Sequence, residues 1–219
     1  DVYKRQLEDM NTSKVLPNYY KSVENIMALE QVMTSGYVKI GAANKALVNS
    51  YRSGDKRKNL YFKAQSASII NVVKYGDSGN DGYRCSFRSA EAYLIAAEAE
   101  AQLAHDNATI TDAHLAQART FLKLLMAKRY TAAKYTQYAA ELDDLQKADL
   151  LKAIIAERTY ELAFEGHRWF DLRRTSRPAL NKTYADRTFE LSENDSRYTL
   201  RFPIEAVEAN PNIEKWTVQ

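Results

Sequence analysis

The chain has 219 residues, of which 45% are hydrophobic and 27% are charged. This balance excludes an intrinsically disordered protein, and the length is sufficient for a hydrophobic core without disulfides or metals. The formal net charge of +3 is too small for a dedicated polyanion binder, so we expect no nucleic-acid partner. A single cysteine, Cys85, excludes an internal disulfide, and the lack of an apolar run of about 18 residues predicts no membrane-spanning helix.

Helical periodicity dominates the first part of the chain. Apolar residues three and four apart predict a helix over Lys21–Met33, and a shorter helix over Ala42–Tyr51 that ends before Gly54. The aromatic and β-branched residues of Asn59–Tyr75 predict a strand or an irregular segment, and the glycines of Tyr75–Gly82 predict a loop.

Two helices with a short link follow the loop. The alanine-rich stretch Arg88–His105 predicts a helix whose small residues let a neighbour approach closely. Asp112 is placed to cap a second helix that runs to about Arg129. The pair resembles one helical hairpin of tetratricopeptide proteins, but a single clear unit does not demonstrate a repeat array.

The last third changes from helix to strand. Apolar spacing predicts a helix from about Leu145 to Glu165, ended by Gly166 in a left-handed conformation, and another helix over His167–Arg174. Alternating residues in Thr188–Leu191 and Tyr198–Phe202 predict a β-hairpin. We therefore predict an all-α (mainly α) fold with helical-hairpin units and a small C-terminal β-hairpin.

No motif for metal, cofactor or nucleophilic chemistry is present. None of the three histidines follows a glutamate by three residues, as a di-iron site requires, and one cysteine gives no zinc pattern. The loop Asp77–Gly82 fails as a calcium loop because its third position, Gly79, has no side-chain ligand. We predict no cofactor, no metal and no catalytic residue. The 28 acidic residues leave a glycosidase carboxylate pair open, but nothing singles one out.

A basic cluster, Asp55-Lys56-Arg57-Lys58, lies close to Tyr61 and Phe62. Basic residues beside aromatic ones are typical of single-stranded nucleic-acid sites. The balanced total charge favours a solvated turn instead.

A row of three glutamates lies four residues apart on one predicted helix face: Glu157, Glu161 and Glu165. Like charges at this spacing destabilise a helix by about 0.2–0.5 kcal/mol each unless they are countered. Arginines in the same stretch suit bidentate pairing with carboxylates, so we predict a charged network that locks the turn at Gly166. The expected partner of Glu161 is Arg158 or an arginine of Arg168–Arg174. The alternative is that this stretch is a ligand or catalytic site.

At these residues the chain resembles the SusD/RagB family of outer-membrane nutrient-binding lipoproteins. Three elements carry the resemblance: Arg88–Ala99, Glu157–Arg174, and Phe202-Pro203-Ile204 with Asn210-Pro211-Asn212. Gly54-Asp55-Lys56-Arg57 is similar to a further family element. The motif residues, interpreted as fold determinants, are Arg88, Glu91, Glu98, Glu157, Arg158, Glu161, Glu165, Gly166, Arg168, Trp169, Asp171 and Arg174.

The resemblance implies a non-enzymatic protein that binds an oligosaccharide or polysaccharide at the outer surface of the outer membrane. It would deliver this ligand to a TonB-dependent, SusC-like transporter. Residues 1–219 would be the C-terminal part of such a protein, and the N-terminal helical-repeat region, signal peptide and lipidated cysteine would lie outside this chain. The membrane would be contacted only through that lipid anchor.

The ligand-contacting residues stay unassigned. Among the 15 tyrosines, we expect Tyr19-Tyr20 to be an exposed pair. Two alternatives remain open: a helical-repeat adaptor for protein partners and a glycoside hydrolase.

Overall fold

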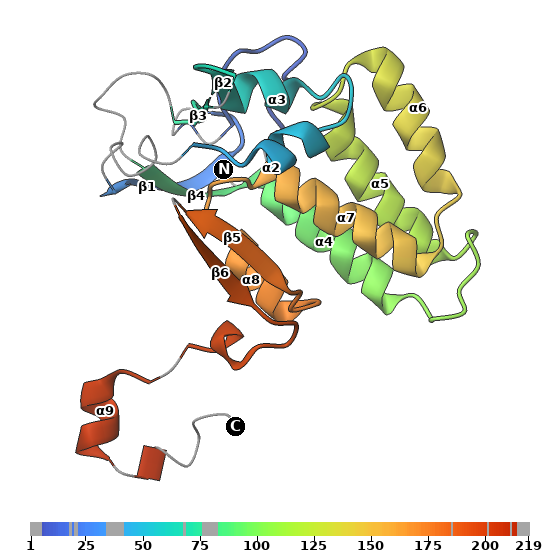
Figure 1. Ribbon diagram of the computed structural model, residues 1–219. Helices are drawn as coiled ribbons and strands as arrows, with labels where there is room; N and C mark the ends of the chain where they lie inside the picture. The colour runs from blue at the N-terminus through green and yellow to red at the C-terminus, as the bar shows by residue number, and fades with distance from the viewer. Residues whose placement is uncertain are drawn as a thin grey trace. The chain divides into compact units, whose positions relative to one another are not determined.

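The computed structural model describes residues 6–17, 19, 22–33, 42–67, 69–75, 83–184, 186–200, 202–210 and 212–213 (Figure 1). The chain divides into two compact units, Asp1–Glu165 and Gly166–Gln219, and each is described by itself. In the described part of the chain, no helix has both the length and the apolar character needed to cross a membrane.

Four helices form the main layer of the first unit: α4 (Ser89–Leu103), α5 (Ala113–Ala127), α6 (Ala132–Asp143) and α7 (Lys147–Glu161). Figure 1 shows α4 beside α5 and α7, and these pairs pack directly. Their shared core is fully buried and includes Leu94, Leu115 and Ile154. The mainly α fold predicted from the sequence is confirmed.

The predicted hairpin of α4 and α5 is also confirmed. Asp112 caps α5 as expected, since its carboxylate accepts hydrogen bonds from the backbone of His114 and Leu115. Helix α6 was not predicted. Only Tyr138 and Leu142 are buried along its length, which leaves little apolar periodicity to detect.

Smaller elements precede these helices: β1 (Asn25–Met33), α2 (Lys45–Ser50), α3 (Lys56–Tyr61), β2 (Phe62–Ala64), β3 (Ile70–Val72) and β4 (Tyr83–Arg88). Helix α2 confirms the short helix predicted within Ala42–Tyr51. The predicted strand character of Asn59–Tyr75 is confirmed for β2 and β3, which pair antiparallel, whereas the segment up to Tyr61 is helical. Most of the predicted loop Tyr75–Gly82 lies outside the described residues.

The predicted helix over Lys21–Met33 is wrong, because Asn25–Met33 forms β1. This strand pairs antiparallel with β4, with Asn25 opposite Arg88 and Ala28 opposite Ser86. A short apolar run fits a helix or a strand about equally well from its own sequence. Here a partner strand, paired at separations of fifty or more residues, decides between them.

Helix α7 ends at Glu161, so the predicted end at Glu165 is wrong. Gly166 does adopt the predicted left-handed conformation, with φ 87°, and Phe164 has φ 65°. Side chains satisfy the final carbonyls of the helix. The Tyr51 hydroxyl donates to the carbonyl oxygen of Tyr160 at 2.8 Å, and Lys74 Nζ donates to that of Glu161 at 2.9 Å.

The second unit contains α8 (Arg168–Arg174), β5 (Leu180–Tyr184), β6 (Arg187–Leu191), the 3-10 turn η2 (Ser196–Tyr198) and α9 (Ile204–Ala209). Helix α8 and a small β-hairpin are confirmed, but the predicted pairing of Thr188–Leu191 with Tyr198–Phe202 is wrong. Strand β6 pairs with β5, which immediately precedes it and so closes a shorter loop. Tyr198 instead stacks on Trp169, with ring centroids 4.9 Å apart. Trp216, expected to fold back onto the domain, lies outside the described residues.

Candidate functional site

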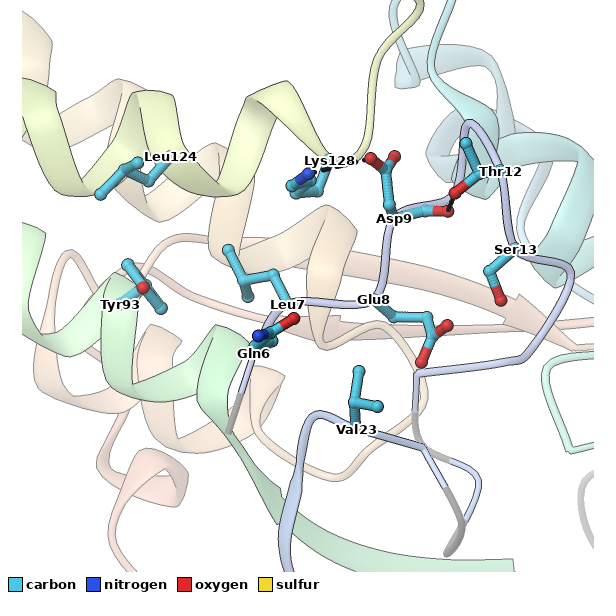
Figure 2. A pocket seen from close by; sticks show the side chains of 10 residues that line it. All are labelled: Gln6, Leu7, Glu8, Asp9, Thr12, Ser13, Val23, Tyr93, Leu124 and Lys128. Carbon is cyan, nitrogen blue, oxygen red and sulfur yellow. Dashed lines mark hydrogen bonds and ion pairs between the residues drawn. The ribbon is translucent and has the colours of Figure 1, made fainter. Parts of the chain in front are cut away.

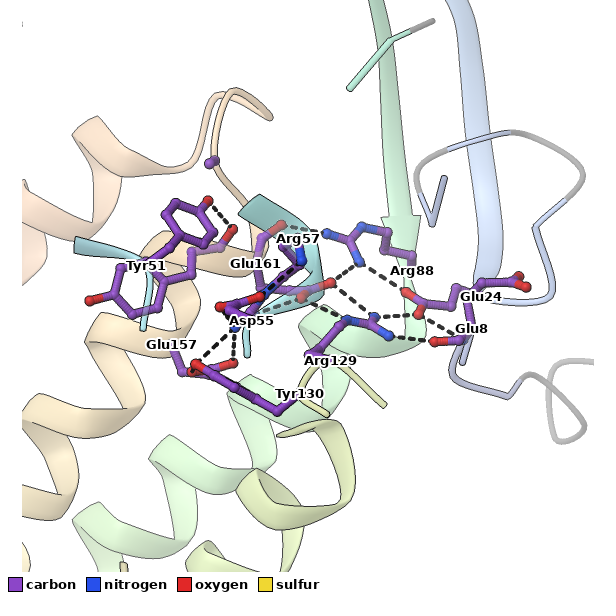
Figure 3. A network of polar contacts seen from close by, with 12 residues as sticks. Glu8, Glu24, Tyr51, Asp55, Arg57, Arg88, Arg129, Tyr130, Glu157 and Glu161 are labelled. Carbon is purple, nitrogen blue, oxygen red and sulfur yellow. Dashed lines mark hydrogen bonds and ion pairs between the residues drawn. The ribbon is translucent and has the colours of Figure 1, made fainter. Parts of the chain in front are cut away.

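Glu161, at the end of α7, is the centre of a buried cluster of charged side chains in the first unit (Figure 3). Three guanidinium groups contact its carboxylate. Arg57 Nη1 and Arg129 Nε lie 3.0 and 2.9 Å from Oε2, and Arg88 Nη1 contacts Oε1 at 2.5 Å. All four side chains are fully buried.

The expected pairing of Glu161 with an arginine is therefore present, but the expected partner is wrong. Arg158 pairs with Glu91 on α4 at 3.1 Å. The arginines that contact Glu161 come from other elements: Arg57 from α3, Arg88 from the end of β4 and Arg129 from just after α5. Residue spacing along α7 therefore could not reveal them.

A second carboxylate, Glu24, extends the cluster toward the N-terminal segment. Arg88 Nη1 lies 2.9 Å from Glu24 Oε2, and Arg129 Nη2 contacts Oε1 of the same side chain. Arg129 Nη1 also donates to the backbone carbonyl of Glu8 at 2.6 Å, and the Glu8 amide donates to Glu24 at 2.8 Å. The cluster thus fixes the backbone of the segment around Glu8 (Figure 3).

At the other end, the basic cluster that we interpreted as a solvated turn is in part buried, and that interpretation is wrong. Arg57 donates from Nε and Nη2 to the two oxygens of Asp55, at 2.9 and 2.7 Å. Its Nη2 also lies 2.6 Å from Glu157, to which Tyr130 donates from its hydroxyl at 3.1 Å. Burial is possible because each charge meets an opposite one.

The surroundings move the pKa values of the three glutamates in different directions. Burial alone would raise the pKa of Glu161, but Arg129, Arg88 and Arg57 outweigh it and hold the pKa well below the ordinary value. Burial likewise opposes ionisation of Glu165, yet Arg88 and Lys74 lower its pKa to about 2. For Glu157 burial prevails over Arg57, and the pKa is raised.

A separate pocket of about 430 Å³ opens beside this cluster, within the first unit (Figure 2). The N-terminal segment around Glu8 and Asp9 forms one wall, and Tyr93 of α4 and Leu124 of α5 form another. At the rim, Lys128 Nζ pairs with Asp9 Oδ2 at 2.9 Å. Its volume falls within the range of about 300–1,000 Å³ that is usual for small-molecule sites.

The sequence matches the SusD family over residues 48–217. This chain belongs to the SusD family. Its fold is also similar to a crystal structure described as a SusD-like carbohydrate-binding protein from Bacteroides vulgatus ATCC 8482, with a TM-score of 0.64 and 21% identity. That similarity covers 97% of this chain and 53% of the other, so the chain spans about half the length of this relative. A search of curated proteins finds no match.

The motif residues of this SusD-family chain fall into both units. Arg88, Glu157, Glu161 and Glu165 meet in the buried cluster, and Glu91 pairs with Arg158 beside it. Glu98 lies on α4. In the second unit, Arg168, Trp169, Asp171 and Arg174 belong to α8 directly after Gly166, and Arg174 Nε donates to Asp171 at 3.0 Å.

Sequence reasoning missed several members of the cluster. Arg57 belongs to the family-like element Gly54-Asp55-Lys56-Arg57 but was predicted to lie in a solvated turn, and no sequence feature pointed to Arg129 or Glu24. Lys74 did carry a signal, because it is a lone charge directly after the segment Ile69–Val73, which is apolar except for Asn71. The pocket was not foreseen either. Of the tyrosine pair singled out, Tyr19 is half-buried and Tyr20 lies outside the described residues.

Proposed function

We propose that this SusD-family protein binds an oligosaccharide or polysaccharide at the cell surface and delivers it to a TonB-dependent transporter without changing it chemically. Family membership over residues 48–217 carries the proposal. The structural relative is itself described as carbohydrate-binding, which supports this ligand class.

The proposal includes a place in a longer protein. The chain spans about half of its structural relative. From the resemblance of its motifs to the family's C-terminal elements, we infer that residues 1–219 are the C-terminal part of the protein. An N-terminal helical-repeat region, a signal peptide and a lipidated cysteine would lie outside this chain, and the lipid would hold the protein at the outer membrane surface.

The surroundings of the glutamate row on and after α7 support the proposed lack of catalysis. Glu157, Glu161 and Glu165 are buried and contacted by cations, so they do not present a carboxylate to a substrate. A glycoside hydrolase needs two carboxyl groups that flank a bound sugar. We therefore propose that the motif residues determine the fold and take no part in chemistry.

Isothermal titration with a panel of soluble polysaccharides, run in parallel with an assay for new reducing ends, tests the proposal. We expect heat of binding for at least one polysaccharide and no release of reducing ends. Steady release would identify a hydrolase. No affinity for any polysaccharide, together with capture of a peptide partner, would favour the helical-repeat adaptor.

A further inference from the structure

One buried acid in the pocket has an unused oxygen. Glu8 is 8% exposed and lines the pocket. Its Oε2 accepts a hydrogen bond from Ser22 Oγ at 3.0 Å, whereas no residue in the described part of the chain donates to Oε1. Each oxygen of an ionised carboxylate can accept hydrogen bonds, so Oε1 is able to accept one from a ligand that brings a hydroxyl or an ammonium group into the pocket.

The opposite wall of the pocket is apolar. Tyr93 lies edge-on to Phe121, with ring centroids 6.2 Å apart, which fixes the orientation of the tyrosine ring. Leu124 adds exposed apolar surface to this wall, at 47%, whereas Val23, 48% exposed, lies beside Glu8. In Figure 2 the side chains of Tyr93 and Leu124 lie on one side of the pocket and the carboxylates of Glu8 and Asp9 on the other. A sugar ring has this same division, with C–H groups on its faces and hydroxyls around its edge.

The charges of the residues that line the pocket further restrict the class of sugar that can bind. The pocket holds two carboxylates, Glu8 and Asp9, against one lysine, Lys128, which is already paired with Asp9. An acidic sugar would bring a further negative charge next to Glu8, and like charges brought together in a partly buried site repel strongly.

We propose that this pocket is a glycan subsite that takes a neutral or amino sugar and excludes uronic acids. Glu8 accepts a hydrogen bond from a sugar hydroxyl or ammonium group, and Tyr93 packs against the face of the ring. The inference rests on the proposed function, because it assumes a glycan ligand and adds its place and chemical class.

The backbone around Glu8 is fixed independently of its side chain. Arg129 holds the Glu8 carbonyl, Glu24 accepts from the Glu8 amide, and the Met10 amide donates to the Lys128 carbonyl at 3.0 Å. Together with the hydrogen bond that Ser22 donates to Oε2, these contacts hold the carboxylate in position before a ligand arrives, which reduces the ordering cost of binding. A change of Glu8 to glutamine leaves all three backbone anchors in place.

Titration calorimetry on the 219-residue chain tests the subsite with three probes: dextran, glucosamine oligomers and polygalacturonate. We expect wild type to bind dextran or glucosamine oligomers and to reject polygalacturonate. Glu8→Gln should weaken binding of glucosamine oligomers about tenfold, and Tyr93→Ala should weaken both accepted probes about tenfold. The control Glu141→Gln alters an exposed acid on α6 and should bind as wild type does. Melting temperatures show whether each variant is folded. If Glu8→Gln does not fold, the affinity of Tyr93→Ala for the accepted probes tests the subsite.

The outcomes separate the two proposals. Wild-type affinity in both folded pocket variants, or a preference for polygalacturonate, overturns the subsite alone. If neither the 219-residue chain nor the longer protein that contains it binds any polysaccharide, the proposed function falls and the subsite falls with it. Binding by the longer protein alone overturns the subsite and leaves the proposed function standing.

Discussion

Removal of a charged residue from the buried cluster leaves its partners without water or a counter-charge, unlike removal of a surface ion. Glu161 is surrounded by three guanidinium groups that have no access to water. Its removal leaves those cations without their central counter-charge, whereas removal of an exposed acid leaves a solvated partner. The predicted cost therefore depends on burial more than on the number of ion pairs.

Glu161→Ala should lower the free energy of unfolding by about 3–5 kcal/mol, as loss of a buried ion-pair partner does. Glu161→Gln should be milder, because the amide keeps the shape and one acceptor oxygen. The control is Glu141→Ala, which removes a 44% exposed carboxylate paired with Arg52 and should cost less than about 1 kcal/mol. Urea denaturation measures all three. Equal losses for the two alanine variants would show that the cluster contributes no more than a surface pair.

Stability should also depend on pH through Glu165. Its pKa in the folded protein is lowered to about 2 from an ordinary 4.5, so the unfolded state binds a proton more readily below about pH 4.5. The stabilisation is complete above that pH and is lost as pH falls toward 2; at about 1.4 kcal/mol per pKa unit it amounts to roughly 3 kcal/mol. Urea denaturation between about pH 6 and pH 3 should show a smaller decline for Glu165→Gln than for wild type. Parallel declines would contradict the assignment.

Helices and strands could be predicted where residue spacing or a capping residue marks them within their own sequence. Helices α4 and α5 were visible because their small and apolar residues recur with helical spacing and Asp112 marks a start. Helix α6 buries too few residues to show that spacing, and the type of β1 is set by β4 far along the chain. The candidate site likewise has a part that local sequence signals predict and a part that they do not. The row of glutamates on α7 was evident, but its partners and the pocket walls come from segments that meet only in the folded chain.

The cap of α5 gives a prediction at this scale. Asp112→Ala should destabilise the protein by about 1 kcal/mol, because two backbone amides at the start of α5 lose their acceptor. Asp144→Ala, at the C-terminal end of α6, is the matched control and should change stability little. Thermal unfolding followed by circular dichroism compares them. A larger loss in the control would contradict the capping role.

In the first unit as a whole, the buried cluster joins segments from the whole length of that unit. Arg129 alone connects Glu8, Glu24 and Glu161, and through Glu8 it positions one wall of the pocket. We therefore separate two kinds of acid in one molecule: those that hold the fold, represented by Glu161, and one that faces a ligand, Glu8.

The most direct test of this separation measures unfolding free energy and glycan affinity on the same two variants, Glu161→Gln and Glu8→Gln. We predict that Glu161→Gln is clearly less stable than wild type but, while folded, binds dextran or glucosamine oligomers with wild-type affinity. We predict the reverse for Glu8→Gln, with near-normal stability and about tenfold weaker binding of glucosamine oligomers. A stable Glu161→Gln protein that has lost binding, beside a Glu8→Gln protein that has kept it, would contradict the assignment and would place the ligand site at the end of α7.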